Sequence, residues 1–89
     1  MTKAPITSGR AVRDHVAAGW ELWHISDSPI PGRWELRRRH ESRPVHWDAI
    51  ERVRRHYLDW FRERTVEEQV GRYTWCYRPL QPALRGMTA

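Results

Sequence analysis

Arginine and tryptophan are the residues of this sequence with the most evident chemistry, and that chemistry is binding. Fifteen of the sixteen basic residues are arginine, and six residues are tryptophan. A guanidinium forms paired hydrogen bonds with phosphate or carboxylate, and an indole ring stacks on bases. In the alternating segments 20–25 and 33–39, one face would carry Trp23 together with Arg33, Arg37 and Arg39. Such a face can bind nucleic acid, and the alternative is a charged strand surface that serves solubility.

A second group of arginines falls on a predicted helix that begins near Trp47. We include Arg55 and Arg62 among the candidate residues for contact with a partner or nucleic acid, beside the four of the hairpin face. Acidic residues alternate with arginines here, and Glu51 precedes Arg55 by four positions, a favourable spacing for an ion pair. The competing interpretation is therefore a solvated, salt-bridged helix surface.

The remaining reactive side chains form no recognisable catalytic or metal-binding pattern. The five histidines lack the spacing of general acids, general bases or metal ligands. Cys76 is the only cysteine, which leaves no internal disulfide and no cysteine cluster for zinc. No phosphate loop or nucleophile elbow occurs. We expect no enzyme activity, no cofactor and no metal, and we expect a reducing, cytoplasmic location.

Residues 8–46 resemble the opening of HicA-type toxins, which are small double-stranded-RNA-binding-like domains. A helix that ends in glycine leads into a strand, which here begins Gly19-Trp20-Glu21-Leu22. That family places its catalytic histidine in a Gly-Ser-His context soon after the first strand, whereas segment 26–32 contains no histidine. The resemblance implies a shared supersecondary pattern, and a histidine-based ribonuclease toxin is the least favoured function.

Charge and size favour a small domain with an anionic partner. The formal net charge is +5 at pH 7 and the sequence pI is near 10.3, which favours nucleic acid, nucleoprotein or an acidic protein surface. The codon bias of a GC-rich genome would also enrich arginine. In 89 residues there is no run of about 18 apolar residues, so we predict one domain and no membrane span.

The N-terminal half predicts a short helix followed by a β-hairpin. Thr7 or Ser8 can cap the helix, and Gly19 can end it. Apolar and polar residues then alternate in segments 20–25 and 33–39, on either side of a turn-rich loop, as in two paired strands.

The repeated triplet Trp-Glu-Leu predicts the pairing register of this hairpin. If Leu22 lies opposite Leu36, apolar pairs share one face and Glu21 faces Arg37 on the other. A shift of one residue would break both matches, so this register is preferred.

The segment from Trp47 to Phe61 predicts one long amphipathic helix, because its apolar residues recur at spacings of three and four. The apolar stripe consists of Trp47, Ile50, Val53, Tyr57, Trp60 and Phe61. Residues 40–46 should connect the hairpin to this helix, with a short extended piece at 44–46.

The segment after this helix has two interpretations. Thr65 and Glu68 have the spacing of a capping box, so the helix either restarts at Thr65 and ends at Gly71 or continues without a break. Residues 72–78 alternate again, with aromatic residues on one face, and predict a final strand.

These elements predict a small two-layer α+β domain in the order helix-strand-strand-helix-strand, with one long amphipathic helix packed on an antiparallel sheet. We expect a flexible arm at 1–7, a globular domain at 8–78 and a proline-containing tail at 79–89. The last strand either extends the hairpin or forms an edge along which two copies pair, so we also expect a homodimer through an open sheet edge.

The expected function is binding without catalysis. Tryptophan and arginine are enriched at interface hot spots, and a small basic domain without a catalytic set fits a regulator or inhibitor of a protein or nucleoprotein target. Small accessory proteins of phages and mobile elements, including anti-CRISPR proteins, are similar in this respect. The alternative is a DNA- or RNA-binding module that uses the Arg/Trp face of the hairpin and loses affinity steeply with salt.

Overall fold

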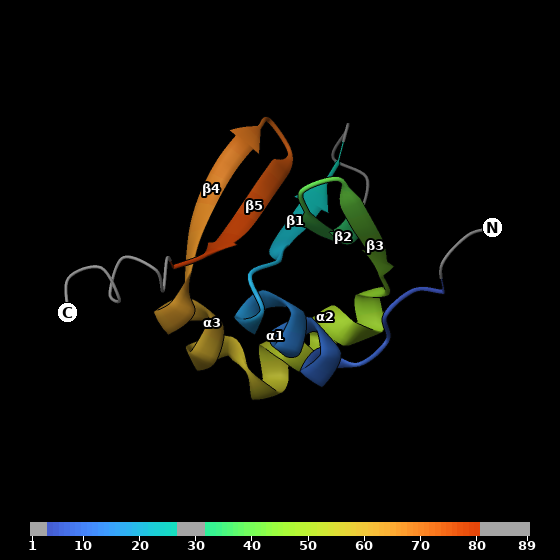
Figure 1. The fold of residues 1–89 in the computed structure, drawn as a ribbon, viewed down its shortest axis with the longest axis vertical. Coiled ribbons are helices and arrows are strands. Elements are labelled where there is room, and N and C mark those ends of the chain that lie inside the picture. The colour runs from blue at the N-terminus through green and yellow to red at the C-terminus, as the bar shows by residue number, and fades with distance from the viewer. Residues whose placement is uncertain (1–3, 27–31, 81–89) are drawn as a thin grey trace.

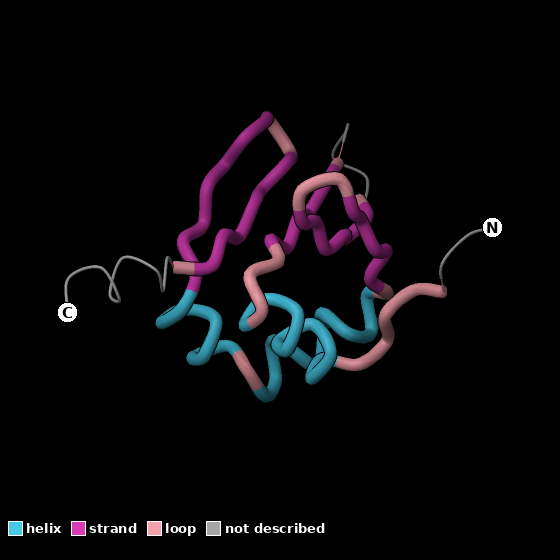
Figure 2. The backbone as a smooth tube through the Cα atoms, in the orientation of Figure 1, coloured by secondary structure: helices cyan, strands magenta, loops and turns pink. Residues whose placement is uncertain are grey.

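Three helices and five strands are present in the residues that the computed structural model describes, 4–26 and 32–80 (Figure 1). In chain order they are α1 (Gly9–Ala17), β1 (Glu21–Ile25), β2 (Arg33–Arg38), β3 (Glu41–Val45), α2 (Trp47–His56), α3 (Leu58–Arg64), β4 (Thr65–Gly71) and β5 (Thr74–Pro79). The strands form one sheet in the order β3-β2-β1-β5-β4, and all neighbours are antiparallel. The predicted α+β class with an antiparallel sheet is confirmed, and Figure 2 shows the helices gathered beside one end of the strands.

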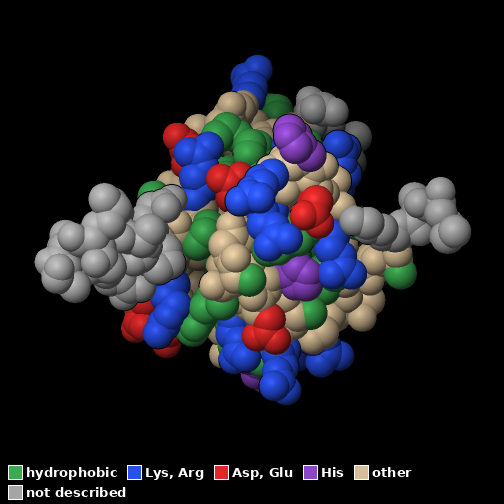
Figure 3. Space-filling model, in the orientation of Figure 1, with side chains coloured by type: hydrophobic (Ala, Val, Ile, Leu, Met, Phe, Trp, Pro, Cys, Tyr) green, Lys and Arg blue, Asp and Glu red, His purple; other side chains and the backbone are tan. Residues whose placement is uncertain are grey.

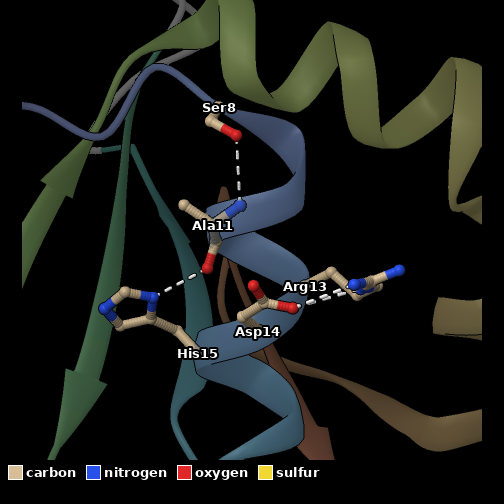
Figure 4. Close-up of polar contacts among 5 residues, drawn as sticks. All are labelled: Ser8, Ala11, Arg13, Asp14 and His15. Atoms are coloured by element: carbon tan, nitrogen blue, oxygen red, sulfur yellow. Dashed lines mark hydrogen bonds and ion pairs between the residues drawn. The ribbon is translucent and has the colours of Figure 1, made fainter.

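Helix α1 has the predicted cap at each end. The Oγ of Ser8 accepts a hydrogen bond from the Ala11 amide at 3.2 Å (Figure 4). Gly19 follows the helix with φ +105°, a conformation that residues with a side chain rarely adopt. Between these ends, Val12 and Val16 are buried against the rest of the molecule, so α1 contributes directly to the core.

The predicted hairpin forms in the predicted register. Leu22 of β1 lies opposite Leu36 of β2, and Glu21 lies opposite Arg37. Leu36 is completely buried, because its side of the sheet faces the core. Most of the predicted loop between the strands, residues 27–31, lies outside the described residues.

Residues 41–45 form a strand, β3, where a connector was predicted. Pro44 lacks an amide hydrogen, and β3 tolerates it because a strand at the edge of a sheet pairs on only one side. The outer side of β3 contacts Ile6, whose amide donates to the Pro44 carbonyl at 2.9 Å. Ile6 is buried although it falls within the predicted arm, and the division into arm, domain and tail stays a prediction.

The predicted single long helix is wrong, because the chain forms two helices. Tyr57 has φ −129° and ψ 14° and separates α2 from α3. Trp47 was assigned to the buried stripe, yet it is 62% exposed. The buried residues of α2 are Ala49, Ile50 and Val53. At about 100° per residue, Trp47 points about 110° away from the centre of that buried face.

Both helical interpretations of residues 65–71 are wrong, since this segment is strand β4. Thr65 is extended, and its hydroxyl donates backwards to the Phe61 carbonyl at 2.6 Å, which satisfies a carbonyl at the end of α3. The chain then pairs with β5, which confirms the predicted final strand. Strand β5 lies between β4 and β1, so it extends the hairpin side of the sheet and is not an edge.

Candidate functional site

The open face of the sheet, opposite the buried core, carries three of the predicted binding residues. Alternation places Trp23 of β1 on this face with Arg33 and Arg37 of β2. The guanidinium of Arg37 lies over the Trp23 ring, 4.6 Å from its centroid. Arg33 and Arg37 also contact the same Glu35 carboxylate, at 3.6 and 3.1 Å. The structure therefore brings these residues together, with a carboxylate between the two arginines.

These contacts continue across the sheet as a ladder of alternating charge. The Nε1 of Trp23 donates to Glu21 at 3.1 Å, and Arg78 of β5 contacts Glu21 at 3.0 Å. Arg78 also contacts Glu68 of β4 at 2.9 Å. We call this set the sheet ladder: Arg33, Glu35, Arg37, Trp23, Glu21, Arg78 and Glu68. It contains three arginines and three glutamates, so its formal charge is zero and each guanidinium already has a carboxylate partner.

Cys76 lies on the same face of the sheet, beside the sheet ladder. Its side chain is fully buried opposite Trp23 of β1 and Glu68 of β4. Burial raises the pKa of the thiol, and the carboxylate of Glu21 raises it further. A buried, protonated thiol is a poor nucleophile, so Cys76 acts here as a small apolar side chain.

The other three predicted binding residues lie elsewhere. Arg39 is in the turn between β2 and β3, with φ +52°, while Arg55 and Arg62 are on α2 and α3. All three side chains are exposed, and none forms an ion pair with another described residue. The six residues thus do not form a single surface.

A surface of α2 combines an exposed indole with free cations, and the sequence interpretation named only Arg55 of its residues as a candidate for binding. A hollow of about 320 Å³ is lined by Trp47, Asp48, Glu51, Arg52, Arg55 and His56, which we call the α2 surface. The predicted pair between Glu51 and Arg55 does not form, because Glu51 contacts Arg54 at 3.9 Å. Arg52 and Arg55 therefore remain without a carboxylate partner among the described residues.

The balance of charges is the same in the helices and in the rest of the described chain: seven arginines and five acidic residues lie in α1, α2 and α3, and seven and five lie outside them. In Figure 3, basic and acidic side chains are intermixed over the sheet and also lie side by side over the helical end. Helix α1 adds to the helical end, because Gly9 packs closely against Arg52 and the guanidinium of Arg13 lies 5.0 Å from the Tyr57 ring centroid. The helical end therefore differs from the sheet ladder in ion pairing: Arg52 and Arg55 have no carboxylate partner among the described residues, whereas each arginine of the sheet ladder has one.

A group of four aromatic rings occupies the opposite face of the sheet from the ladder. His24 stacks on Trp34 at 4.3 Å between centroids and lies 6.3 Å from Trp75, while Trp34 lies 6.2 Å from Tyr77. Burial lowers the pKa of His24. Burial also raises the pKa of Tyr77, and together with the neighbouring Glu67 it brings that pKa to about 12. The rings lie against one another and are half-buried, so we assign this group a structural role.

Another hollow, of about 640 Å³, offers little chemistry. It lies between the end of α1, helix α3 and Leu80. Its charged lining residues, Glu63 and Arg64, contact each other at 3.4 Å. With this pair formed, the described lining has no free charge to recognise a ligand.

Comparison with protein-family models, with curated proteins and with solved structures found no match to this chain. No helix in the described ranges is long and apolar enough to cross a membrane. Within the same ranges, no three His, Cys, Asp or Glu side chains are grouped in a way that would hold a metal ion.

Proposed function

We propose that this protein is a non-enzymatic binding protein that regulates or inhibits a protein or nucleoprotein target through its α2 surface. The observation that carries the proposal is the exposure of Trp47 beside Arg52 and Arg55, two arginines without ion-pair partners. Tryptophan and arginine dominate binding energy at interfaces when they become buried together. A partner that covers Trp47 would bury the exposed indole, and its carboxylates or phosphates would form ion pairs with the two arginines.

The alternative, a DNA- or RNA-binding module that uses the hairpin face, is less well supported. Phosphate binding there would require Arg33 and Arg37 to leave Glu35, and the sheet ladder has no net charge to attract a polyanion. Small accessory proteins of phages and mobile elements that act by binding are the functional class we propose.

A photo-crosslinking amino acid at position 47 tests the proposal. The matched control carries the same amino acid at position 66, because Val66 is also exposed, at 53%, but lies on β4. In host lysate, we expect position 47 to capture a specific protein that position 66 does not capture, and crosslinks from position 66 to join only two copies of this chain. That protein, once purified, should then be titrated with the wild type and the variants.

Trp47→Ala should weaken binding of the purified target by at least about tenfold, the loss typical of a hot-spot residue. Val66→Ala should change the affinity by less than about twofold. Equal binding by the wild type and Trp47→Ala would show that the α2 surface is not the contact. Capture of nucleic acid alone would favour the alternative function.

A further inference from the structure

A second basic cluster lies where α1 meets strands β2 and β3, and it shares no residue with the α2 surface. Four side chains form it, and we call it the His15 cluster: His15, Trp20, Arg38 and Arg43. The Trp20 ring lies edge-on to the His15 imidazole at 5.2 Å between centroids, and the Arg38 guanidinium lies 4.8 Å from the centroid of Trp20. The buried indole of Trp20 thus connects the imidazole with one of the arginines.

The orientation of His15 follows from its two hydrogen bonds. Its Nδ1 is 2.7 Å from the Ala11 carbonyl oxygen, as Figure 4 shows. Because a carbonyl can only accept, Nδ1 carries the hydrogen in this arrangement. The Nε2 of the neutral ring then accepts from Nη1 of Arg43 at 2.9 Å. His15 therefore holds the guanidinium of Arg43 in a defined position without neutralising it.

Arg43 is a half-buried cation without an acidic partner. Its contact with His15 uses one of the five N–H donors of the guanidinium, and no described carboxylate lies within 4.0 Å of it. Half-burial of an unneutralised charge is unfavourable, and it favours capture of an anion at this position. The remaining N–H groups form a fork that matches two oxygens of a phosphate.

Arg38 can reach the same position from the neighbouring strand. In the β2–β3 register Leu36 lies opposite Arg43, so Arg38 is the diagonal neighbour of Arg43 on the same face of the sheet. Arg38 contacts Glu41 at 3.2 Å, but both side chains are largely exposed. An exposed ion pair of this kind contributes little, so a phosphate that binds Arg43 can compete with Glu41 for Arg38.

We propose that the His15 cluster binds a phosphate group, with Arg43 as the principal ligand, Arg38 as the second and His15 as the residue that positions Arg43. Two guanidiniums from adjacent strands can hold one phosphate by several charge-assisted hydrogen bonds. The phosphate can come from a nucleic-acid backbone or be a free phosphate. This site does not depend on the α2 surface, and loss of either leaves the other intact.

The test is an NMR titration of the full chain with two probes. One probe is inorganic phosphate, and the other is a short single-stranded DNA without terminal phosphates, titrated at low salt. We expect saturable shifts of the Arg43 Nε–H and His15 Hε1 resonances. Shifts with the DNA alone indicate a backbone phosphodiester, and shifts with inorganic phosphate indicate a free phosphate, so either result supports the site.

Variants distinguish specific phosphate binding by the His15 cluster from non-specific attraction of phosphate to the net positive charge. Arg43→Gln should raise the dissociation constant at least about tenfold, because charge-assisted hydrogen bonds are lost. The matched control is Arg72→Gln, which removes an equal charge from an exposed position in the β4–β5 turn and should change the constant less than about twofold. Arg43→Lys should bind with intermediate affinity, since it keeps the charge and loses the fork.

Two results would overturn the proposal. One is the absence of shifts at His15 and Arg43 with both probes. The other is an equal loss of affinity in Arg43→Gln and Arg72→Gln, which would mean diffuse attraction to net charge. If Arg43→Gln fails to fold by circular dichroism, the exposed Arg38→Gln gives the same test, with an expected loss of at least about threefold.

Discussion

Tryptophan shows most clearly that the role of a side chain in this protein depends on what surrounds it. Trp23 lies against Arg37 and donates to Glu21, so its polar atom and one ring face are already engaged. Trp47 is 62% exposed at the start of α2. The same residue type therefore completes an internal network in one place and remains available to a partner in the other.

Histidine 24 predicts a pH dependence of stability. Burial, and then the charge of Arg54, lowers the pKa of His24 below its usual 6.5. The unfolded chain therefore binds the proton more readily than the folded protein. Above pH 6.5 His24 is neutral in both states, and its favourable contribution to the free energy of unfolding is fully present. This contribution is lost as the pH falls through the lowered pKa of His24 in the folded protein.

Urea unfolding at about pH 7.5 and 5.5 checks this dependence. The wild type should be less stable at the lower pH, and His24→Gln should show a smaller difference between the two. The control is His56→Gln, which changes an exposed histidine and should keep the wild-type difference. An unchanged difference in His24→Gln would contradict the prediction.

Leucine 36 has the largest side chain among the described residues that are completely buried. Its side chain is completely buried on β2 between β1 and β3. Leu36→Ala should lower the free energy of unfolding by about 2–5 kcal/mol, through lost apolar burial and a residual cavity. Val66→Ala, at a 53% exposed position, should change it by about 0.5 kcal/mol or less. Urea midpoints that are equal for the two variants would be inconsistent with this packing.

At the scale of elements, the protein differs most from its sequence interpretation at the two edges of the sheet. Strand β3 contains Pro44 and charged residues, and strand β4 carries a capping-box spacing. An edge strand needs one neighbour and faces water on its other side, so it accepts sequences that do not resemble a buried strand. Strands β1 and β5, which have a neighbour on each side, show the clear alternation.

The junction between α1 and β1 provides a prediction at this scale. Gly19 has φ +105°, and no atom lies within 4 Å of where a Cβ would be. Gly19→Ala should therefore destabilise the protein by about 1–2 kcal/mol through backbone strain alone. Gly71→Ala is the control, because Gly71 has no positive φ and its nearest contact would be an ordinary 3.4 Å. Thermal unfolding that ranks Gly71→Ala as the more damaging would refute this account.

At the scale of the molecule, the net charge of +5 is located outside the sheet ladder. The ladder contains equal numbers of arginines and glutamates, and free arginines lie on the helices, in the turns and in the His15 cluster. Both proposed contact sites use these free cations. If both proposals are right, an anionic partner contacts the molecule where Arg52, Arg55 and Arg43 lack carboxylate partners among the described residues.

The outer edge of β4 leads us to predict a homodimer. Ile6 contacts the outer side of β3, whereas no described residue pairs with the outer side of β4, a strand on which Val66 is 53% and Val70 is 42% exposed. Light scattering between about 10 µM and 1 mM should show a dimer that Val66→Lys weakens, because an edge lysine opposes strand pairing. Leu58→Lys, at a 39% exposed position on α3, should leave it intact. A strict monomer over this range would contradict the prediction.

The sequence by itself determined the elements whose causes are local. Ser8 caps the next turn, Gly19 ends that helix, and the pairing of Leu22 with Leu36 follows from side chains across one hairpin. These features depend on residues close together in the chain and on short-range geometry. For the same reason the open face with Trp23, Arg33 and Arg37 was predictable.

Only the tertiary structure decided which charges are free and which faces are covered. Arg37 is engaged by Glu35 and Trp23, while Arg43 meets His15, which belongs to a helix distant in the sequence. Residues 65–71 form a strand because they pair with β5. Trp47 is exposed because α2 packs on the core through the face that carries Ala49, Ile50 and Val53. Pairing and burial depend on contacts between distant segments, and local periodicity does not contain that information.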